Sequence, residues 1–212
     1  MADLLDVVHS AGREFEGLQV SRADTERFLR GDPRVMMSGA DRDILTDLRE
    51  AGQYILDHRD EPITAATVRA INARLSRSAA LHPGRLRTRD QQIGVTTARG
   101  RHEPSPVTDK GLEQILARAA AEGDDLAVAI ATFIALASAQ PFEDGNKRTA
   151  LLVANAYLLA SGSDEVLMVP GGAEAPGMPT AFADALALAY VDGDHQPVSA
   201  MLRAARVPLG GQ

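Results

Sequence analysis

The 212-residue chain contains no cysteine and no tryptophan, and aromatic residues make up only 4% of it. Without cysteine the protein has no disulfide framework, thiolate zinc site, iron–sulfur cluster or cysteine nucleophile. Lysine is scarce as well, since Lys110 and Lys147 are the only lysines among 22 basic residues. The lack of cysteine fits a reducing compartment, so we expect a cytoplasmic location.

Long hydrophobic runs and an excess of positive charge are also missing. The longest apolar run, residues 126–137, is too short to cross a bilayer, and no basic, apolar leader opens the chain. We therefore expect no membrane partner and no signal peptide. Residues 63–77 superficially resemble a helix-turn-helix, but the net charge of −7 and the lack of a basic recognition helix argue against a DNA partner.

The composition is that of a folded globular protein. Hydrophobic residues make up 45% of the chain and charged residues 24%, close to the globular average. A chain of this length corresponds to one domain, or to one domain with a helical appendage at its N-terminus.

The hydrophobic pattern predicts mainly helices. Apolar residues recur at three- and four-residue spacing between Asp41 and Ile55, which is typical of a helix that buries one face. Two further stretches, residues 126–139 and 150–160, are apolar on nearly every side and predict central helices. The remaining predicted helices cover residues 23–29, 65–75, 108–121, 181–189 and 198–206. Ser21, Thr64 and Thr108 lie at or near the starts of the first three, and Asp124 precedes the helix at 126–139.

The residue pattern changes between Leu81 and Val107. His82-Pro83-Gly84 interrupts the helical pattern, residues 92–97 favour a strand, and Gly100 with Pro104 closes the stretch. We expect a β-hairpin or flap here. The predicted fold class is therefore all-α with one small β element.

Residues 140–148 form a polar loop between the two most apolar helices. The second helix points its free N–H groups and the positive end of its dipole into this turn, which favours an anion. Gly145 would admit a phosphate closely, Lys147 and Arg148 add positive charge, and Asp144 suits a divalent cation that bridges phosphates. These residues favour a Mg–nucleotide site; a plain connecting turn with solvated basic residues is the alternative.

The same loop resembles the central motif of the Fic/Doc family. Residues 141–148, Pro-Phe-Glu-Asp-Gly-Asn-Lys-Arg, are similar to His-x-Phe-x-[Asp/Glu]-[Gly/Ala]-Asn-[Gly/Lys]-Arg. Residues 84–87 with 92–94 resemble the family's approach to its flap, and residues 191–197 resemble its C-terminal helix pair. The resemblance implies a Fic-type helical bundle with a β-hairpin flap at residues 41–206, a helical appendage at 1–40 and a tail at 207–212.

The resemblance also implies roles for individual residues. Asp144 resembles the Mg²⁺ ligand, Arg148 the arginine that grips the terminal phosphates, and Phe142 the aromatic anchor of the loop. The anion-hole backbone would come from Gly145, Asn146 and Lys147. The target-docking flap would clamp a target segment by strand addition and would consist of Ile93, Gly94, Val95 and Thr96, with Thr97 at its end.

The activity implied is transfer of AMP from ATP, with Mg²⁺, to a Ser, Thr or Tyr hydroxyl of a protein target. The chain would then be an enzyme, a protein adenylyltransferase (AMPylase) or a related phosphotransferase. A Doc-like phosphotransferase toxin of a toxin–antitoxin pair and a non-catalytic nucleotide-binding regulatory module are the alternatives. A small antitoxin, self-inhibition and a homodimer remain open as partners.

The motif departs from the family pattern at its catalytic position. Gln140 stands where the family has its histidine base, and a carboxamide cannot take a proton from a hydroxyl near neutral pH. Gln140 therefore indicates a natural pseudoenzyme, a different chemistry on the same scaffold or an engineered inactivation, although positioning and charge neutralisation would leave some activity. An amide that caps the preceding helix is the alternative role for Gln140. Lys147, and Leu151 in place of a second arginine, resemble the Doc branch, whereas Gly145 resembles the AMP-transferring branch.

An N-terminal stretch resembles the family's inhibitory helix, which ends in Ser/Thr-x-x-x-Glu-[Gly/Asn]. Glu16 and Gly17 match its end, but Gly12 stands where Ser or Thr is expected. In the family the glutamate pairs with the second arginine, whose place Leu151 takes here. Glu16 is therefore a candidate inhibitory residue, and an acidic solvated helix is the alternative.

Overall fold

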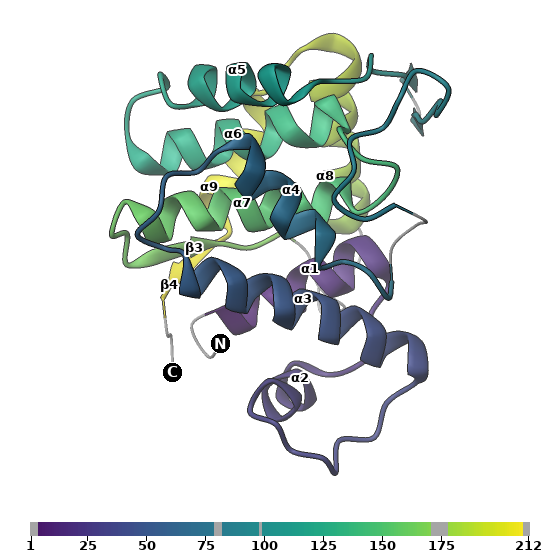
Figure 1. Cartoon of the computed structure of the whole chain (residues 1–212), viewed down its shortest axis with the longest axis vertical. Coiled ribbons are helices and arrows are strands. Elements are labelled where there is room, and N and C mark those ends of the chain that lie inside the picture. Colours follow the sequence, from purple (N-terminus) through teal and green to yellow (C-terminus); the bar gives the residue numbers. More distant parts are fainter. Residues whose placement is uncertain (1–3, 79–81, 98, 171–177, 210–212) are drawn as a thin grey trace.

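The structure, a computed structural model, describes residues 4–78, 82–97, 99–170 and 178–209. Within this part of the chain, helices dominate and two short two-stranded sheets complete the fold (Figure 1). The helices are α1 (Leu5–Glu16), α2 (Arg22–Leu29), α3 (Gly39–Asp57), α4 (Ala65–Ala73), α5 (Asp109–Ala119), α6 (Asp125–Ala139), α7 (Asn146–Ala160), α8 (Met178–Ala187), the π-helical η2 (Leu188–Asp192) and α9 (Gln196–Ala204).

The predicted helix starts are confirmed by their caps. Ser21 accepts a hydrogen bond from Asp24 N at 3.1 Å, and Thr108 accepts one from Gly111 N at 3.1 Å. Thr64 begins α4 with a capping box, and Asp124 caps α6. Each cap satisfies an amide that the first helical turn leaves without a partner.

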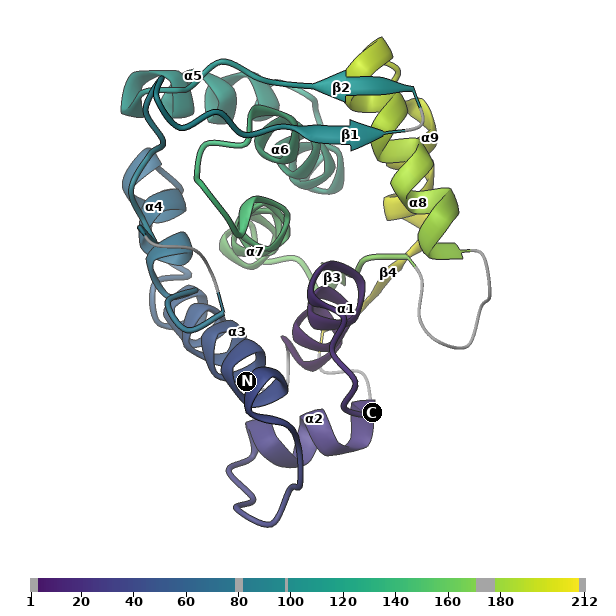
Figure 2. The same cartoon turned by 90° about the vertical axis from the view of Figure 1, so that its right-hand side faces the viewer.

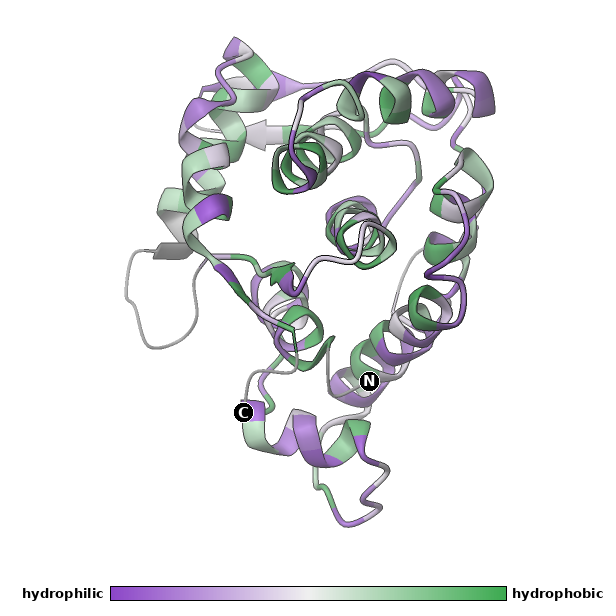
Figure 3. Cartoon of the chain, turned by 90° about the vertical axis from the view of Figure 1, so that its left-hand side faces the viewer, coloured by the Kyte–Doolittle hydropathy of each residue, from purple (hydrophilic) through white to green (hydrophobic). Residues whose placement is uncertain are grey.

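The helix pair α6 and α7 forms the centre of the molecule. Figure 2 looks almost along α7 and shows α1, α3, α4 and α6 arranged around it. Residues 150–154 of α7 are completely buried, which explains why the sequence is apolar on all sides there. The surrounding helices carry both hydrophobic and hydrophilic faces (Figure 3).

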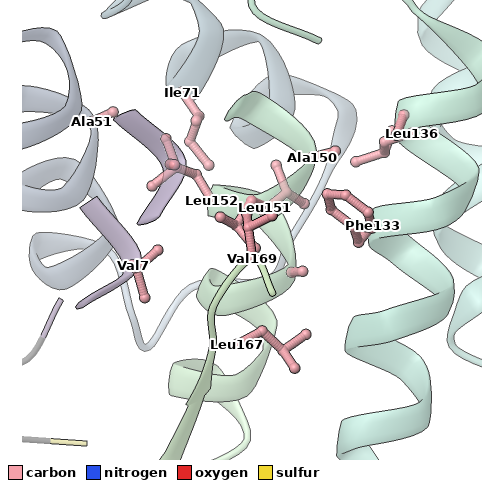
Figure 4. Close-up of a cluster of buried hydrophobic side chains, with 14 of the residues drawn as sticks. Val7, Ala51, Ile71, Phe133, Leu136, Ala150, Leu151, Leu152, Leu167 and Val169 are labelled. Carbon is pink, nitrogen blue, oxygen red and sulfur yellow. The ribbon is translucent and has the colours of Figure 1, made fainter. Parts of the chain in front are cut away.

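The N-terminal helix α1 shares this core. Val7 of α1, Leu151 and Leu152 of α7 and Ile71 of α4 lie in one hydrophobic cluster (Figure 4). Leu4, Val7, Val8 and Ala11 have no exposed surface. Packing against α3 and α7 therefore holds the end of α1 in a defined place beside the start of α7.

The predicted flap is an antiparallel hairpin of β1 (Val95–Thr97) and β2 (Gly100–His102), with Val95 opposite His102. A second two-stranded sheet was not predicted. It pairs β3 (Glu165–Leu167) with β4 (Arg206–Pro208), so the first residues of the expected tail form a strand. Among the described residues, no helix has the length and apolarity needed to cross a membrane.

Candidate active site

A cavity of about 220 Å³ lies where the loop between α6 and α7 meets the flap and the end of α1. Its walls consist of Phe15, Glu16, Ile93, Gly94, Val95, Ala137, Gln140, Glu143, Asp144, Gly145, Asn146, Lys147 and Arg148. The fold thus brings together site residues that are more than 130 positions apart in the sequence, from Glu16 to Arg148. Three residues with predicted roles, Thr96 and Thr97 of the flap and the anchor Phe142, do not line this cavity, and Thr96 is exposed on β1.

The start of α7 supplies backbone donors to the cavity. The first backbone hydrogen bond of the helix runs from Thr149 N to Gly145 O at 2.8 Å, so the amides of residues 146–148 have no backbone acceptor within the described chain. Gly145 has a φ of 72°, and a Cβ added there would lie 2.7 Å from Leu75 Cδ1. The turn therefore requires glycine, and it leaves a helix N-terminus suited to an anion.

Asn146 holds the loop closed from within. Its Oδ1 accepts a hydrogen bond from Phe142 N, and its Nδ2 donates one to Phe142 O, both at 2.9 Å. Phe142 itself is buried, as expected for an anchor. The side chain of Asn146 is therefore committed to the loop, and its backbone amide is what it can offer to a ligand.

Asn72 of α4 supports the same loop and was missed in the sequence. Its Nδ2 donates to Asp144 O at 3.1 Å and to Thr149 Oγ1 at 3.0 Å, and its Oδ1 accepts from Gly84 N at 2.7 Å. Asn72 is almost fully buried, so each of these bonds replaces one with water. The signal that could have revealed it is a polar residue on the otherwise apolar stripe of α4.

Gln140 ends α6 in a left-handed conformation, with φ 43° and ψ 62°. This is a strained backbone for a residue other than glycine. The carbonyl of Gln140 accepts a hydrogen bond from Arg87 Nε at 2.7 Å, and Arg87 N donates to Pro141 O at 2.9 Å. Arg87 is buried, and burial lowers its pKa. Arg87 thus ties the stem of the flap to the turn that presents Gln140.

Arg148 lies at the base of the cavity with no exposed side-chain surface. Its Nη1 donates to Ser78 Oγ at 2.6 Å. Its Nε lies 2.7 Å from Glu16 Oε1, and its Nη2 lies 3.9 Å from Asp144 Oδ1. Neither Nε nor Nη2 makes a well-aligned hydrogen bond within the described chain. One edge of the guanidinium is therefore anchored, and the other faces carboxylates without satisfying its donors.

The pairing of Glu16 with Arg148 corrects the partner expected from the family pattern. Leu151, in the place of the second arginine, is buried in the core, and Glu16 reaches the first arginine instead. Burial raises the pKa of Glu16 above its ordinary value, although Arg148 acts in the opposite direction. The packing of Leu18 explains why glycine stands at position 12, where the family pattern has Ser or Thr, because a Cβ there would lie 2.9 Å from Leu18 Cδ2.

The end of α1 also contacts the other basic residue of the loop. Lys147 Nζ lies 5.4 Å from the centre of the Phe15 ring, within the range of a cation–π interaction. Burial raises the pKa of Glu14, and the positive charge of Lys147 opposes that shift. The last turn of α1 therefore engages both Lys147 and Arg148.

Asp144 meets the requirements of a magnesium ligand that works together with a nucleotide. Its side chain is 47% exposed at the cavity, and its Oδ1 accepts from Gly145 N at 2.6 Å. No group of three or more metal-ligating side chains occurs in the described part of the chain. Mg²⁺ is usually held by one or two carboxylates plus substrate phosphates, so a single carboxylate fits an ion delivered with its nucleotide.

The flap is fixed at its second strand. His102 Nε2 lies 2.7 Å from Ser138 O, and its ring stacks on Tyr190 of η2 at 5.1 Å. A Cβ at Gly94 would lie 2.7 Å from His102 O, so the approach to β1 needs glycine. Glu143, on the opposite wall, is held by His82 Nδ1 at 2.7 Å and by Gln91.

Residues 62–158 match the family model described as Fic/DOC family. This segment is a Fic/DOC-family domain. The matched segment extends from the residues before α4 to nearly the end of α7, so it includes the flap and the whole loop from Gln140 to Arg148. Glu16 lies outside the match and joins the Fic/DOC site from α1.

Solved structures of Fic proteins share the fold. A Fic domain-containing signaling protein from Bacteroides thetaiotaomicron has a TM-score of 0.72 and 18% identity, over 95% of this chain and 81% of that one. Fic-1 (residues 134–508) from C. elegans has a TM-score of 0.70 and 20% identity, over 95% and 59%. A Fic family protein from Desulfovibrio desulfuricans has a TM-score of 0.70 and 17% identity, over 96% and 62%.

At these identities the likeness establishes the Fic fold, and the chain spans only about three-fifths of the last two structures. None of the curated proteins matches the sequence significantly. The predicted family and the predicted all-α bundle with a flap are confirmed. The chemistry of this Fic domain depends on the residues that line its cavity.

Proposed function

We propose that this Fic-domain protein binds Mg-ATP in the cavity and transfers AMP to a Ser, Thr or Tyr hydroxyl of a protein target. The observation that carries the proposal is the convergence of a helix N-terminus, a buried arginine and a flap on one cavity. Proteins of the Fic/DOC family generally transfer AMP or other nucleotide groups to proteins.

In such a transfer the hydroxyl oxygen of the target attacks the α-phosphorus of ATP. The bond from that phosphorus to the bridging oxygen breaks, and pyrophosphate leaves with the electron pair. The amides at the start of α7 and the guanidinium of Arg148 would stabilise the charge on the phosphate oxygens. Mg²⁺, held by Asp144 and the phosphates, would supply further charge neutralisation. Residues Ile93 to Val95 would position the target segment beside the flap.

The hydroxyl proton has no evident acceptor at the motif position. Gln140 lines the cavity, but its amide is not a base. A missing base reduces the rate by about 10²–10⁴-fold, whereas positioning and charge neutralisation remain. We therefore propose that the activity is slow in the chain as it stands.

Self-inhibition by α1 belongs to the same proposal. Glu16 and Phe15 contact Arg148 and Lys147, the two cations that would bind phosphate. A nucleotide that uses Arg148 must displace the carboxylate of Glu16 or bind beside it. Glu16 would therefore weaken nucleotide binding, with a small antitoxin or a second copy of the chain as other regulators to test.

Intact-mass spectrometry of the Gln140→His protein, incubated with Mg-ATP, tests the proposal. Addition of AMP to the protein or to an added target supports it. Addition of a phosphate instead would favour a Doc-like phosphotransferase, the alternative suggested by Lys147. The matched control is Gln140→His combined with Arg148→Ala, which should lose the modification because the phosphate contact is gone.

A non-catalytic nucleotide-binding module is the second candidate, and Gln140 in the position of the base favours it. This candidate predicts that Mg-ATP binds to the wild-type and Gln140→His proteins alike and that neither is modified or turns over nucleotide. Calorimetry on the same two proteins separates the candidates. Failure of both proteins, and of Glu16→Gln, to bind Mg-ATP would reject both functions.

A further inference from the structure

Arg148 is oriented by a residue that lies outside the Fic motif. Ser78, in the segment after α4, accepts a hydrogen bond from Arg148 Nη1 at 2.6 Å. A serine hydroxyl has one proton, and that of Ser78 is directed to Asp47 Oδ2 at 2.8 Å. The hydroxyl must therefore act as an acceptor toward Arg148, and its direction is fixed by Asp47.

Asp47 of α3 is fully buried, and its environment explains how a buried carboxylate is tolerated. Besides the Ser78 hydroxyl, its oxygens accept from Ser78 N at 2.8 Å and from Arg77 N at 3.0 Å. Arg77 Nη1 lies 3.1 Å away and shares its charge with the exposed Glu50. A buried carboxylate without such partners would cost several kcal/mol, so these bonds explain how Asp47 can be buried.

The bond to Ser78 decides which edge of Arg148 is free. With Nη1 bonded to Ser78, the edge formed by Nε and Nη2 remains without an aligned acceptor. Two parallel N–H groups on one edge match two oxygens of a phosphate. Glu16 lies at this edge in the structure, which indicates that the edge accepts an anion.

We propose that Ser78, oriented by Asp47, is a positioning residue that turns the Nε–Nη2 edge of Arg148 toward a nucleotide phosphate. The phosphate part of this inference rests on the proposed function; the orientation of Arg148 does not. A simpler role for Asp47 is to hold the turn at residues 77–78 through backbone amides. That role needs no hydroxyl on residue 78, so Ser78→Ala separates the two.

The first measurement uses the free protein. Nuclear magnetic resonance follows the exchange of the Arg148 guanidinium protons with water, with the signals assigned by their loss in Arg148→Lys. A hydrogen bond to a charged group is worth about tenfold or more in such an equilibrium, so Ser78→Ala should accelerate the exchange of the Nη1 protons by about that factor. Ser78→Thr keeps the hydroxyl and should restore the slow exchange.

The second measurement uses calorimetry in the Glu16→Gln background, where the carboxylate of Glu16 no longer competes for the free edge of Arg148. Ser78→Ala should weaken Mg-ATP binding about tenfold and leave adenosine binding unchanged, because adenosine carries no phosphate. Ser163→Ala is the matched control, since within the described residues the Ser163 hydroxyl bonds to the backbone of Glu165 at the start of β3.

The outcomes separate the orientation of Arg148 by Ser78 from the effect of that orientation on Mg-ATP binding. If Ser78→Ala leaves proton exchange unchanged, Ser78 does not orient Arg148 and the inference is wrong. Faster exchange with unchanged Mg-ATP affinity also overturns it, because the orientation would then have no consequence for phosphate. If the Glu16→Gln protein binds no Mg-ATP, the proposed function fails, and proton exchange alone still decides whether Ser78 orients Arg148.

Discussion

Replacing Glu16 by glutamine should strengthen Mg-ATP binding, because the carboxylate occupies the arginine edge that a phosphate would use. Glu16 Oε1 lies 2.7 Å from Arg148 Nε without an aligned hydrogen bond, and burial already raises the pKa of Glu16. The contact is therefore at the weak end of charged hydrogen bonds, which contribute about 1.5–3 kcal/mol. If the contact between Glu16 and Arg148 contributes about 1.5–2 kcal/mol, its removal in Glu16→Gln should lower the Kd for Mg-ATP tenfold to thirtyfold.

The effect should depend on pH with a defined sign. Because the pKa of Glu16 is raised, protons neutralise it at a higher pH than an ordinary glutamate, and the neutral form no longer competes for Arg148. As pH falls from 7.5 toward the pKa of Glu16, the wild type should therefore approach the affinity of Glu16→Gln. The ratio of the two Kd values removes the titration of the nucleotide itself, which both proteins share.

Isothermal titration calorimetry at several pH values is the assay, with Glu122→Gln as the matched control. Glu122 is exposed before the start of α6, at the opposite end of that helix from the cavity, and its substitution changes the net charge by the same amount. Equal Kd values for wild type and Glu16→Gln at pH 7.5 would refute the competition. A truncation of residues 1–20 is not a substitute, because Leu4, Val7 and Val8 fill the core.

Three further substitutions test the loop. Gly145→Ala should lower the free energy of unfolding by about 1–3 kcal/mol, because φ at this position is 72° and the new Cβ would lie 2.7 Å from Leu75 Cδ1. Denaturation in urea measures this loss of stability, and an unchanged midpoint would contradict the prediction. Asn72→Ala should cost about 2–4 kcal/mol in the same assay, since it leaves three partners unsatisfied, and the bonds to Thr149 and Gly84 are buried. Asn72→Asp should restore part of this stability through Gly84 N. Lys147→Ala should weaken Mg-ATP binding several-fold if its ammonium contacts phosphate, and Lys110→Ala, the only other lysine, should not; equal effects would exclude that contact.

Local physics made much of the fold predictable. The apolar stretches of α6 and α7 and the caps at Ser21, Thr64 and Thr108 are encoded within a few residues, and each was predicted close to its observed position. The sheet of β3 and β4 could not be predicted in this way. Its strands β3 and β4 are three residues each and are separated by the whole C-terminal helical region, so their pairing is decided by tertiary contacts.

The candidate site likewise contains a part that could be predicted from local sequence and a part that could not. The loop from Gln140 to Arg148 could be recognised because its residues are contiguous and their order carries the chemistry. The contacts that hold Arg148 could not, because Glu16 and Ser78 approach it from α1 and from the segment after α4. The partner of Glu16 depends on the position at which α1 packs against α7, and no local sequence pattern determines that position. Asn72 shows the same limit, since its three partners lie on separate segments.

The turn at Gln140 has an evolutionary consequence. The strained backbone, the Arg87 bond to its carbonyl and the glycine turn that follows are all in place around a side chain that is not a base. Restoring a base would therefore require a new side chain at this position and no rebuilding of the loop. Glutamine and histidine codons differ only in their third base. A single nucleotide change is therefore enough to place a base at this position.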